Sequence, residues 1–347
     1  MLSGTALQEQ SMRLDTPLMV GDVQIANRAW LAPMAGVTDG PFRGLAATGG
    51  AGLVVCEMTA CSQLAASDAR TQGEWRRKLA PTPGVPFVVQ LAGREPDWLA
   101  RGARLAQDLG ADIIDINMGC PAKIVTKGAS GAALMRDLDL AERLIAATSA
   151  ATTRPVTVKM RLGWDDATRN APELARRAQA NGVAAVTVHG RTRAQFYKGT
   201  ADWTAVRAVR AAITIPLIVN GDITGPVTAR AALAASGADG VMVGRGSYGR
   251  PWSPGSIAHN RPARVATADD VIAHYDAMLT AYGVERGVRH ARKHLGWYLL
   301  ATGAPPASVK SWRAQVCQAE CPKAVRRLMC AALDALAQEP TAPPVAA

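Results

Sequence analysis

Aromatic side chains are scarce in this sequence: Phe, Tyr and Trp make up 5% of 347 residues, although 48% of the residues are hydrophobic. The core must therefore rest on Ala, Val, Leu and Ile, which favours an α/β fold with closely packed helices. A chain of this length can bury a full core and has room for one large barrel with an appendage.

Long apolar segments are also missing. No run approaches the roughly 18 consecutive apolar residues of a membrane-spanning helix, so we expect no membrane partner. Residues 1–16 lack the basic start and the apolar stretch of a secretory signal. We therefore expect a cytoplasmic protein.

The six cysteines follow no regular spacing, which argues against a disulfide framework and favours reduced thiols. Cys317, Cys321 and Cys330 lie near one another in the sequence and could be imagined as metal ligands. Their C-x3-C spacing comes without a histidine or a fourth local ligand, and positions four residues apart share one face of a helix. We therefore expect no metal.

Acidic residues are outnumbered, 28 against 39 Lys and Arg, which leaves a formal charge of +11. The segment from Thr280 to Cys330 alone contains nine Lys or Arg against Glu285 and Glu320, a net charge of +7. Solubility could account for a dispersed excess, but such a concentrated one favours a polyanionic partner.

Eight short apolar runs alternate with segments of helical periodicity at intervals of about 30 residues. This rhythm predicts a (β/α)8 TIM barrel. A doubly wound sheet is the alternative, but it would ordinarily carry a G-x-G-x-x-G turn after its first strand. The predicted strands are 28–34, 52–58, 86–93, 112–119, 155–163, 184–191, 216–223 and 240–246. The predicted helices include 97–109, 138–147, 172–180, 203–211 and 226–236.

The character of the sequence changes after Pro251, where Pro254, Gly255 and Pro262 interrupt regular structure. Thr267 is a candidate capping residue for a new helix. We therefore predict four parts: a flexible N-terminus (1–16), the barrel (17–262), a small all-α domain (263–337) and a Pro/Ala-rich disordered tail (338–347).

Nearly every predicted strand has a polar or charged group at its carboxyl end, and in a barrel these ends converge on one mouth where sites are built. The groups at the ends are Met34, Glu57, Gln90, Asn117, Lys159, His189, Asn220 and Arg245. The alternative is that strand ends are polar because they reach water. This would explain one or two of these residues, but it explains poorly a set that meets at one mouth.

The ends of the seventh and eighth strands suggest a phosphate site. Glycines in Asn220-Gly221-Asp222 and Gly244-Arg245 allow backbone N–H groups to approach phosphate oxygens, and the arginine adds a permanent charge. Two tight turns with a surface arginine are the alternative. A phosphorylated cofactor follows from the first interpretation, and flavin mononucleotide (FMN) fits.

Lys159 lies inside an otherwise apolar strand, which is costly unless the lysine meets an anionic or electron-rich ligand. Beside a flavin ring its charge would stabilise the anionic reduced form. Gln90 could hydrogen-bond the pyrimidine edge of the ring. His189 could contact the phosphate or the ring, although a structural core histidine is an alternative.

Cys120 follows the apolar run 113–116 and lies between Gly119 and Pro121. A free thiol is mostly protonated at neutral pH, so it can act as an acid or, once deprotonated, as a nucleophile. No histidine lies in the same motif to remove its proton, which favours a general acid over a nucleophile. An inert buried cysteine is the alternative.

Two basic segments suggest an anionic substrate. The loop 121–131, with Lys123, could close over the substrate or could be an ordinary solvated loop. In the helical domain, Arg286, Arg289 and Lys293 share one helical face, and aromatic residues follow directly. This pattern suits phosphates and stacked bases, although a solvated basic face is the alternative.

Residues 19–337 resemble the tRNA-dihydrouridine synthases, most closely the bacterial B-type subgroup. The resemblance rests on the following motifs: APMAGVTDGPFR (32–43), INMGCPAK (116–123), VHGRTR (188–193), NGDI (220–223), GRGSYGRPW (244–252) and RKHLGWY (292–298). It implies an FMN-dependent barrel and a C-terminal helical domain that binds tRNA. The implied reaction reduces the C5–C6 double bond of a D-loop uridine, with NADPH as electron donor.

The resemblance also implies roles for individual positions. The proton donor to C5 is Cys120. The implied cofactor-binding residues are Pro33, Met34, Ala35, Gln90, Lys159, His189, Asn220, Gly221, Asp222, Gly244 and Arg245. The implied substrate-binding residues are Asn117, Lys123, Arg161, Arg286, Arg289, Arg292 and Lys293.

Two other functions remain open from the sequence. One is an FMN-dependent oxidoreductase that acts on a small pyrimidine or an enone, which would not need a basic helical domain. The other is a non-catalytic RNA-binding protein that retains a barrel. No protein partner is implied, and we expect a monomer.

Overall fold

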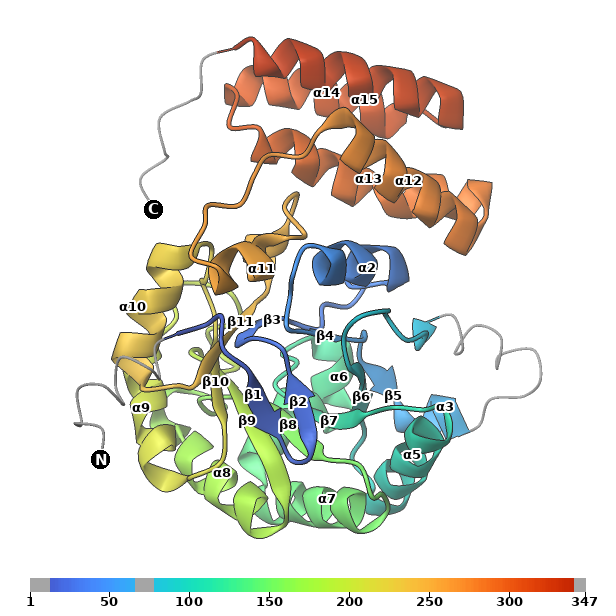
Figure 1. The fold of residues 1–347 in the computed structure, drawn as a ribbon. Coiled ribbons are helices and arrows are strands. Elements are labelled where there is room, and N and C mark those ends of the chain that lie inside the picture. The colour runs from blue at the N-terminus through green and yellow to red at the C-terminus, as the bar shows by residue number, and fades with distance from the viewer. Residues whose placement is uncertain (1–12, 66–77, 340–347) are drawn as a thin grey trace. The chain divides into compact units, whose positions relative to one another are not determined.

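The computed structural model describes residues 13–65 and 78–339 (Figure 1). Most of the predicted flexible N-terminus (1–16) and of the predicted tail (338–347) lies outside these residues. The described chain forms two compact units. One contains the residues up to Gly246 together with Ser253–Pro262, and the other contains Ser247–Trp252 together with the residues from Ala263 onward.

The first unit is a closed barrel of eight parallel strands, which confirms the predicted fold. The sheet runs β4-β3-β11-β10-β9-β8-β7-β6, and pairing of β4 with β6 closes it. A short strand, β5 (Thr59–Ala60), pairs with the end of β6. The barrel strands are β3 (Ala29–Leu31), β4 (Leu53–Val55), β6 (Phe87–Ala92), β7 (Ile113–Met118), β8 (Val156–Arg161), β9 (Val183–His189), β10 (Leu217–Asn220) and β11 (Gly240–Val243).

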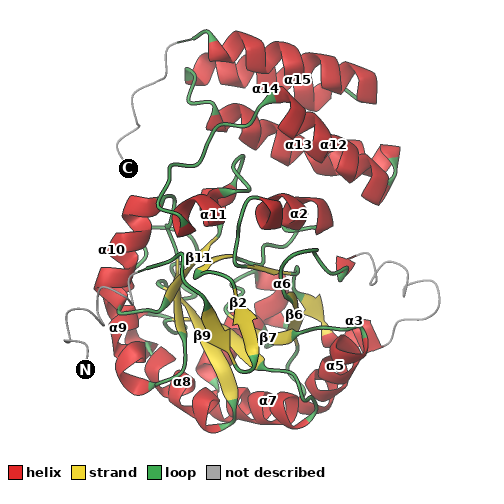
Figure 2. Ribbon diagram, in the orientation of Figure 1, coloured by secondary structure: helices red, strands yellow, loops and turns green. Residues whose placement is uncertain are grey.

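Helices surround the strands (Figure 2). They include α2 (Gly40–Thr48), α3 (Cys61–Ala65), α5 (Pro96–Asp108), α6 (Lys123–Lys127), α7 (Leu138–Ala150), α8 (Ala171–Ala180), α9 (Trp203–Ala212), α10 (Pro226–Ser236) and α11 (Ser253–Ala258). Short 3-10 helices are η1 (Gly131–Arg136), η2 (Asp166–Thr168) and η3 (Arg245–Ser247). All five helices that the periodicity predicts in the barrel are present.

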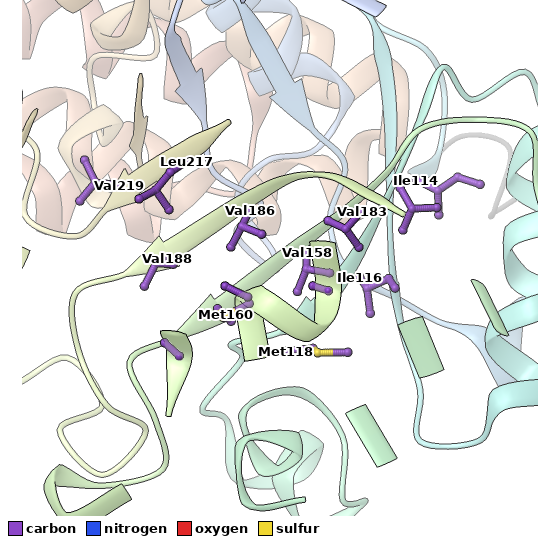
Figure 3. Packing of buried hydrophobic residues seen from close by; sticks show 14 of the residues in the cluster. Ile114, Ile116, Met118, Val158, Met160, Val183, Val186, Val188, Leu217 and Val219 are labelled. Atoms are coloured by element: carbon purple, nitrogen blue, oxygen red, sulfur yellow. The ribbon is translucent and has the colours of Figure 1, made fainter. Parts of the chain in front are cut away.

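Strand alternation separates two sets of side chains. On β7, Ile114, Ile116 and Met118 belong to a large aliphatic cluster that includes residues of the surrounding helices, and Figure 3 shows this cluster across β7–β10. The residues between them, such as Asp115 and Asn117, occupy the opposite face of the strand. The outer face is apolar, and the polar residues are confined to the interior.

A hairpin that the sequence did not predict contributes to the apolar part of the interior. Strands β1 (Leu18–Val20) and β2 (Val23–Ile25) pair antiparallel ahead of the barrel. Their Val20 and Ile25 join a separate cluster with inward residues near the amino ends of the strands, among them Trp30, Ile113 and Ile218. The polar inward residues therefore lie above this cluster, toward the carboxyl ends.

The second unit contains four helices: α12 (Ala268–Tyr282), α13 (Val284–Ala301), α14 (Pro306–Gln318) and α15 (Pro322–Ala337). Thr267 caps α12 and accepts a hydrogen bond from the Asp270 N–H. One cluster that includes Tyr275, Leu295 and Met329 joins the helices. Within the described residues, no helix has the length and apolarity to span a membrane.

The hairpin gives a test of the core. Ile25 is fully buried, so Ile25→Ala should lower the free energy of unfolding by about 2–5 kcal/mol through lost burial and a cavity. Met19 on the same hairpin is 48% exposed, and Met19→Ala should change the free energy of unfolding by less than about 0.5 kcal/mol. Chemical denaturation of both variants measures the difference; equal losses would contradict a packed role for the hairpin.

Candidate functional site

The inward side chains at the carboxyl ends of the strands form a polar layer inside the barrel. Strand register aligns Gln90 with Asp115, Asn117 with Lys159, and Arg161 with His189. His189 in turn aligns with Asn220 on β10. The structure thus brings together residues that the sequence predicts for one site, from five consecutive strands.

A chain of hydrogen bonds runs through this layer to Cys120. Gln90 Nε2 donates to Asp115 Oδ2 at 2.7 Å, and Asn117 Nδ2 donates to Gln90 Oε1 at 2.8 Å. Asn117 Oδ1 accepts from the N–H of Cys120 at 2.9 Å and of Gly119 at 3.2 Å. Each amide has one end anchored by its neighbour, so both amides have a defined orientation.

Asp115 begins this chain. Thr157 Oγ1 donates to its second oxygen at 2.6 Å. Burial raises the pKa of Asp115 to about 6, while the hydrogen bonds from Gln90 and Thr157 and the charge of Lys159 act in the opposite direction. At neutral pH the carboxylate therefore remains ionised and acts as an acceptor from both neighbours.

Lys159 faces the barrel interior rather than the helices. Its Nζ donates to Asn220 Oδ1 at 3.0 Å, and Asn220 Nδ2 donates to the Met242 carbonyl at 2.7 Å. Burial and the nearby charge of Arg161 lower the pKa of Lys159 to about 8. The site thus contains a half-buried ammonium that is charged at neutral pH and that an anionic or electron-rich ligand would stabilise.

Arg161 braces the loops around Cys120. Its Nε donates to the Gly119 carbonyl at 2.8 Å, and its Nη1 donates to the carbonyls of Thr192 and Phe196 at 2.9 and 2.8 Å. Burial lowers its pKa to about 10, so it stays charged at neutral pH. The guanidinium therefore ties the loop after β7 to the loop after β9.

His189 lies beside a second arginine. Its Nε2 is 3.2 Å from Nη1 of Arg191. Burial, followed by the charges of Lys159, Arg161 and Arg191, lowers the pKa of His189 well below its usual value. The imidazole is therefore neutral at physiological pH, and its Nε2 can accept a hydrogen bond from the guanidinium.

Asp222 is held by two arginines. Its Oδ2 accepts from Arg191 Nη2 at 2.6 Å and from the Ala201 N–H at 2.8 Å, and its Oδ1 accepts from Arg245 Nη2 at 3.3 Å. Hydrogen bonds and charge from Arg191 lower the pKa of Asp222 against the effect of burial. Its carboxylate thus orients Arg245, whose side chain is 48% exposed.

The two glycines of the predicted phosphate site differ. Gly221 has φ +114°, and an added Cβ would lie 2.8 Å from Ala201 Cβ, so this turn requires glycine. At Gly244 an added Cβ would make only ordinary contacts, the nearest being Met34 Sδ at 3.8 Å. Gly244 thus leaves space between the loops after β3 and β11.

The predicted residues at the first strand form a turn over that space. Pro33, Met34 and Ala35 follow β3, and the Met34 N–H donates to Thr38 Oγ1 at 2.9 Å. The Gly36 N–H donates to the carboxylate of Glu57. Lys123, by contrast, is exposed on α6, directly after the Cys120 loop.

The basic residues that the sequence predicts on α13 divide into two groups. Arg286 and Arg289 are exposed in the first turns of α13, where Arg289 pairs with Glu285. Further along, α13 and α14 form a pocket of about 480 Å³ whose lining includes no carboxylate. The lining residues are Arg292, Lys293, Lys310, Arg313, Ala314 and Cys317.

Sequence reasoning missed several of these groups. Asp115 lies two residues before Asn117 on one strand. Because residues two apart share a face of a strand, this spacing could have predicted that Asp115 faces the same site. Lys310 and Arg313 are three residues apart on α14, a spacing that indicates a shared face. Arg191, 1% exposed, had no comparable signal, because charged side chains are seldom buried.

The described residues contain no group of three or more His, Cys, Asp or Glu arranged to bind a metal ion. The cations at the carboxyl ends of the strands instead suit an anionic organic ligand. Lys159 lies inside the barrel, and Arg245 lies at the rim.

Sequence comparison identifies close relatives. The dihydrouridine synthase family model matches residues 30–337. A probable tRNA-dihydrouridine synthase from Rhizobium leguminosarum bv. phaseoli is 52% identical over 314 residues, which cover 90% of this chain and 97% of that protein. A tRNA-dihydrouridine synthase B from Xanthomonas campestris pv. campestris is 46% identical over 332 residues, which cover 92% and 96%.

Solved structures with similar folds share little sequence. Histamine dehydrogenase from Rhizobium sp. 4-9 aligns with a TM-score of 0.56 at 14% identity, covering 77% of this chain and 51% of that one. Morphinone reductase in complex with tetrahydroNAD aligns with a TM-score of 0.54 at 16% identity, covering 72% and 92%. These similarities support the barrel fold, and the sequence match over residues 30–337 shows that the chain belongs to the dihydrouridine synthase family.

Proposed function

We propose that this chain is a tRNA-dihydrouridine synthase that reduces the C5–C6 double bond of a D-loop uridine, with bound FMN and with NADPH as reductant. Family membership supports the reaction. The observation that carries the proposal is the arrangement of Cys120 and Asn117 at the end of β7 beside the inward-facing ammonium of Lys159. A tRNA substrate and reduced thiols favour action in the cytoplasm, and we propose that the protein acts as a monomer.

The residues present fit FMN. Lys159, Gln90 and Asn220 would face the ring, and Arg245 with the backbone at Gly221 and Gly244 would hold the phosphate. When bound, FMN supplies hydride chemistry toward C6 of the uracil. Lys159 would contribute a positive charge inside the barrel, next to the ring that becomes anionic when it is reduced.

Cys120 delivers the proton to C5. Its backbone is held by the Asn117 side chain and by the Ala132 N–H, which donates to the Cys120 carbonyl at 3.0 Å. Arg161 fixes the preceding carbonyl, of Gly119. A thiol fixed in this way can reach one face of a flipped-out uracil, and the second N–H of the Asn117 amide remains available for a uracil carbonyl.

The helical unit binds the tRNA. Four cations line its pocket, and Gly296 allows Arg313 to lie close against α13, because an added Cβ would come within 2.9 Å of Arg313 Nε. A concave, cationic surface suits a polyanionic backbone. Arg286 and Arg289 extend the basic surface along α13.

The decisive experiment combines the purified protein, NADPH and an unmodified tRNA transcript. Mass spectrometry of the digested tRNA should show a two-hydrogen increment at one uridine. With Cys120→Ala the yield of dihydrouridine should fall by about 100-fold or more, because the proton donor is lost, while NADPH oxidation persists. Cys330→Ala, a half-buried thiol in α15, is the control and should retain product formation. Normal product from Cys120→Ala would exclude the proton-donor role.

Because Lys159 loses its charge at high pH, we expect cofactor binding to depend on pH. Its folded-state pKa of about 8 lies below the ordinary lysine value, so its charge is present below pH 8 and is lost above it. The affinity of the apoprotein for FMN should therefore fall as pH rises from about 7 to about 9. Fluorescence titration with FMN measures this, and Lys159→Met should bind weakly and without that pH dependence. Equal pH profiles for the two proteins would remove Lys159 from the site.

Removal of cationic side chains from the pocket between α13 and α14 should weaken tRNA binding. Lys310→Ala and Arg313→Ala should each weaken tRNA binding about fivefold and reduce its salt dependence, because each removes a phosphate contact. Filter binding at several salt concentrations measures both effects. Arg104→Ala on the barrel helix α5 removes the same charge from another surface; affinities that match this control would contradict the pocket's role.

A further inference from the structure

Two arginines in the loops of the barrel mouth converge on one tryptophan. Arg136 ends η1, which packs against β7 and β8, and Arg193 lies in the loop after β9. Their guanidinium carbons lie 4.6 Å and 4.7 Å from the ring centroid of Trp164, in the loop after β8. Since β7, β8 and β9 are neighbours, these loops meet on the side of the barrel that carries Cys120.

These arginines lack the acceptors that the buried arginines have. Arg161 donates to three main-chain carbonyls, whereas neither Arg136 nor Arg193 forms an ion pair within residues 13–65 and 78–339. Arg193 has a long hydrogen bond, 3.5 Å, to Thr126 Oγ1 on α6. Its Nε is buried and has no acceptor among the described residues.

The carboxylates next to this cluster are committed elsewhere. Asp137 caps α7, and Asp165 caps η2. Asp166 pairs with Arg169 at 2.8 Å. Among the described residues, none of the three forms an ion pair with the guanidinium groups over Trp164.

Stacking prepares the two side chains to bind an anion. A guanidinium over a ring uses its flat face, and its N–H groups at the edge stay available for oxygen acceptors. Each side chain is already ordered, which reduces the entropy lost on binding. Because both guanidinium carbons lie within about 5 Å of the same ring centroid, an anion bound beside that ring is attracted by both positive charges.

We propose that Arg136, Trp164 and Arg193 form a seat for a backbone phosphate of the substrate RNA, next to the loop that carries Cys120. The inference rests on the proposed function for the identity of the RNA. It adds a contact within the barrel unit itself, separate from the basic pocket of the helical unit. A phosphate held here positions the strand from which the target uridine leaves its stack.

Binding of an unmodified tRNA transcript tests the proposal. Arg136→Ala and Arg193→Ala should each weaken affinity about fivefold and reduce the slope of log K against log salt by about 1. Arg193→Lys keeps the charge but loses the planar stack, so its slope should stay near that of the wild type while its affinity falls. Under steady-state conditions KM for tRNA should rise, and kcat at saturating tRNA should be retained.

Arg154→Ala is the matched control. Arg154 is an exposed arginine that precedes β8, at the opposite end of the barrel. Arg154→Ala therefore lowers the net charge by the same amount as Arg136→Ala and leaves the residues at the barrel mouth unchanged. Because Arg136 is also exposed, Arg136→Ala should fold normally and keeps the test valid if Arg193→Ala is unstable. Thermal unfolding verifies the fold of each variant.

The outcomes separate this inference from the proposed function. If Arg136→Ala binds tRNA with the same affinity and the same salt dependence as Arg154→Ala, the phosphate seat is wrong, even if dihydrouridine forms normally. A wild-type protein that does not bind tRNA would overturn it as well. If the wild type binds tRNA with the expected loss in Arg136→Ala but forms no dihydrouridine, the phosphate seat stands and the proposed reaction fails.

Discussion

Both faces of every strand in a closed parallel barrel are covered, one by helices and one by the interior, and this constraint organises the whole catalytic unit. On β7 the residues Ile114, Ile116 and Met118 pack outward, so Asp115 and Asn117 must point inward. Neighbouring strands follow the same rule in register. The polar layer at the mouth thus results from alternation on five consecutive strands.

Buried charge distinguishes this layer from an ordinary core. Burial raises the pKa of Asp115 and lowers that of Lys159, yet both groups stay ionised at neutral pH because each has hydrogen-bond partners and an opposite charge nearby. Asp115 orients the Gln90 and Asn117 amides. Lys159 keeps a positive charge in the interior, where a ligand can use it.

Arginines have three different roles in this protein. Arg161 and Arg191 are buried and hold loops together through main-chain carbonyls and Asp222. Arg313 lines a pocket of the helical unit. Arg136 and its partner Arg193 lie over Trp164 and form no ion pair among the described residues. The acceptors that each guanidinium has, rather than its position in a motif, separate the structural arginines from those suited to an RNA backbone.

The sequence by itself determined the barrel, because apolar runs recurring every 30 residues with polar ends leave few other folds. It also predicted a role for Lys159 and Asn220, since a polar residue in an apolar strand is conspicuous, and for Cys120, which follows a strand and lies between Gly119 and Pro121. Tertiary structure alone decided the contacts between segments distant in sequence. The chain from Asp115 through Gln90 to Cys120, and the meeting of three loops at Trp164, depend on strand register and loop conformation, which local periodicity does not encode.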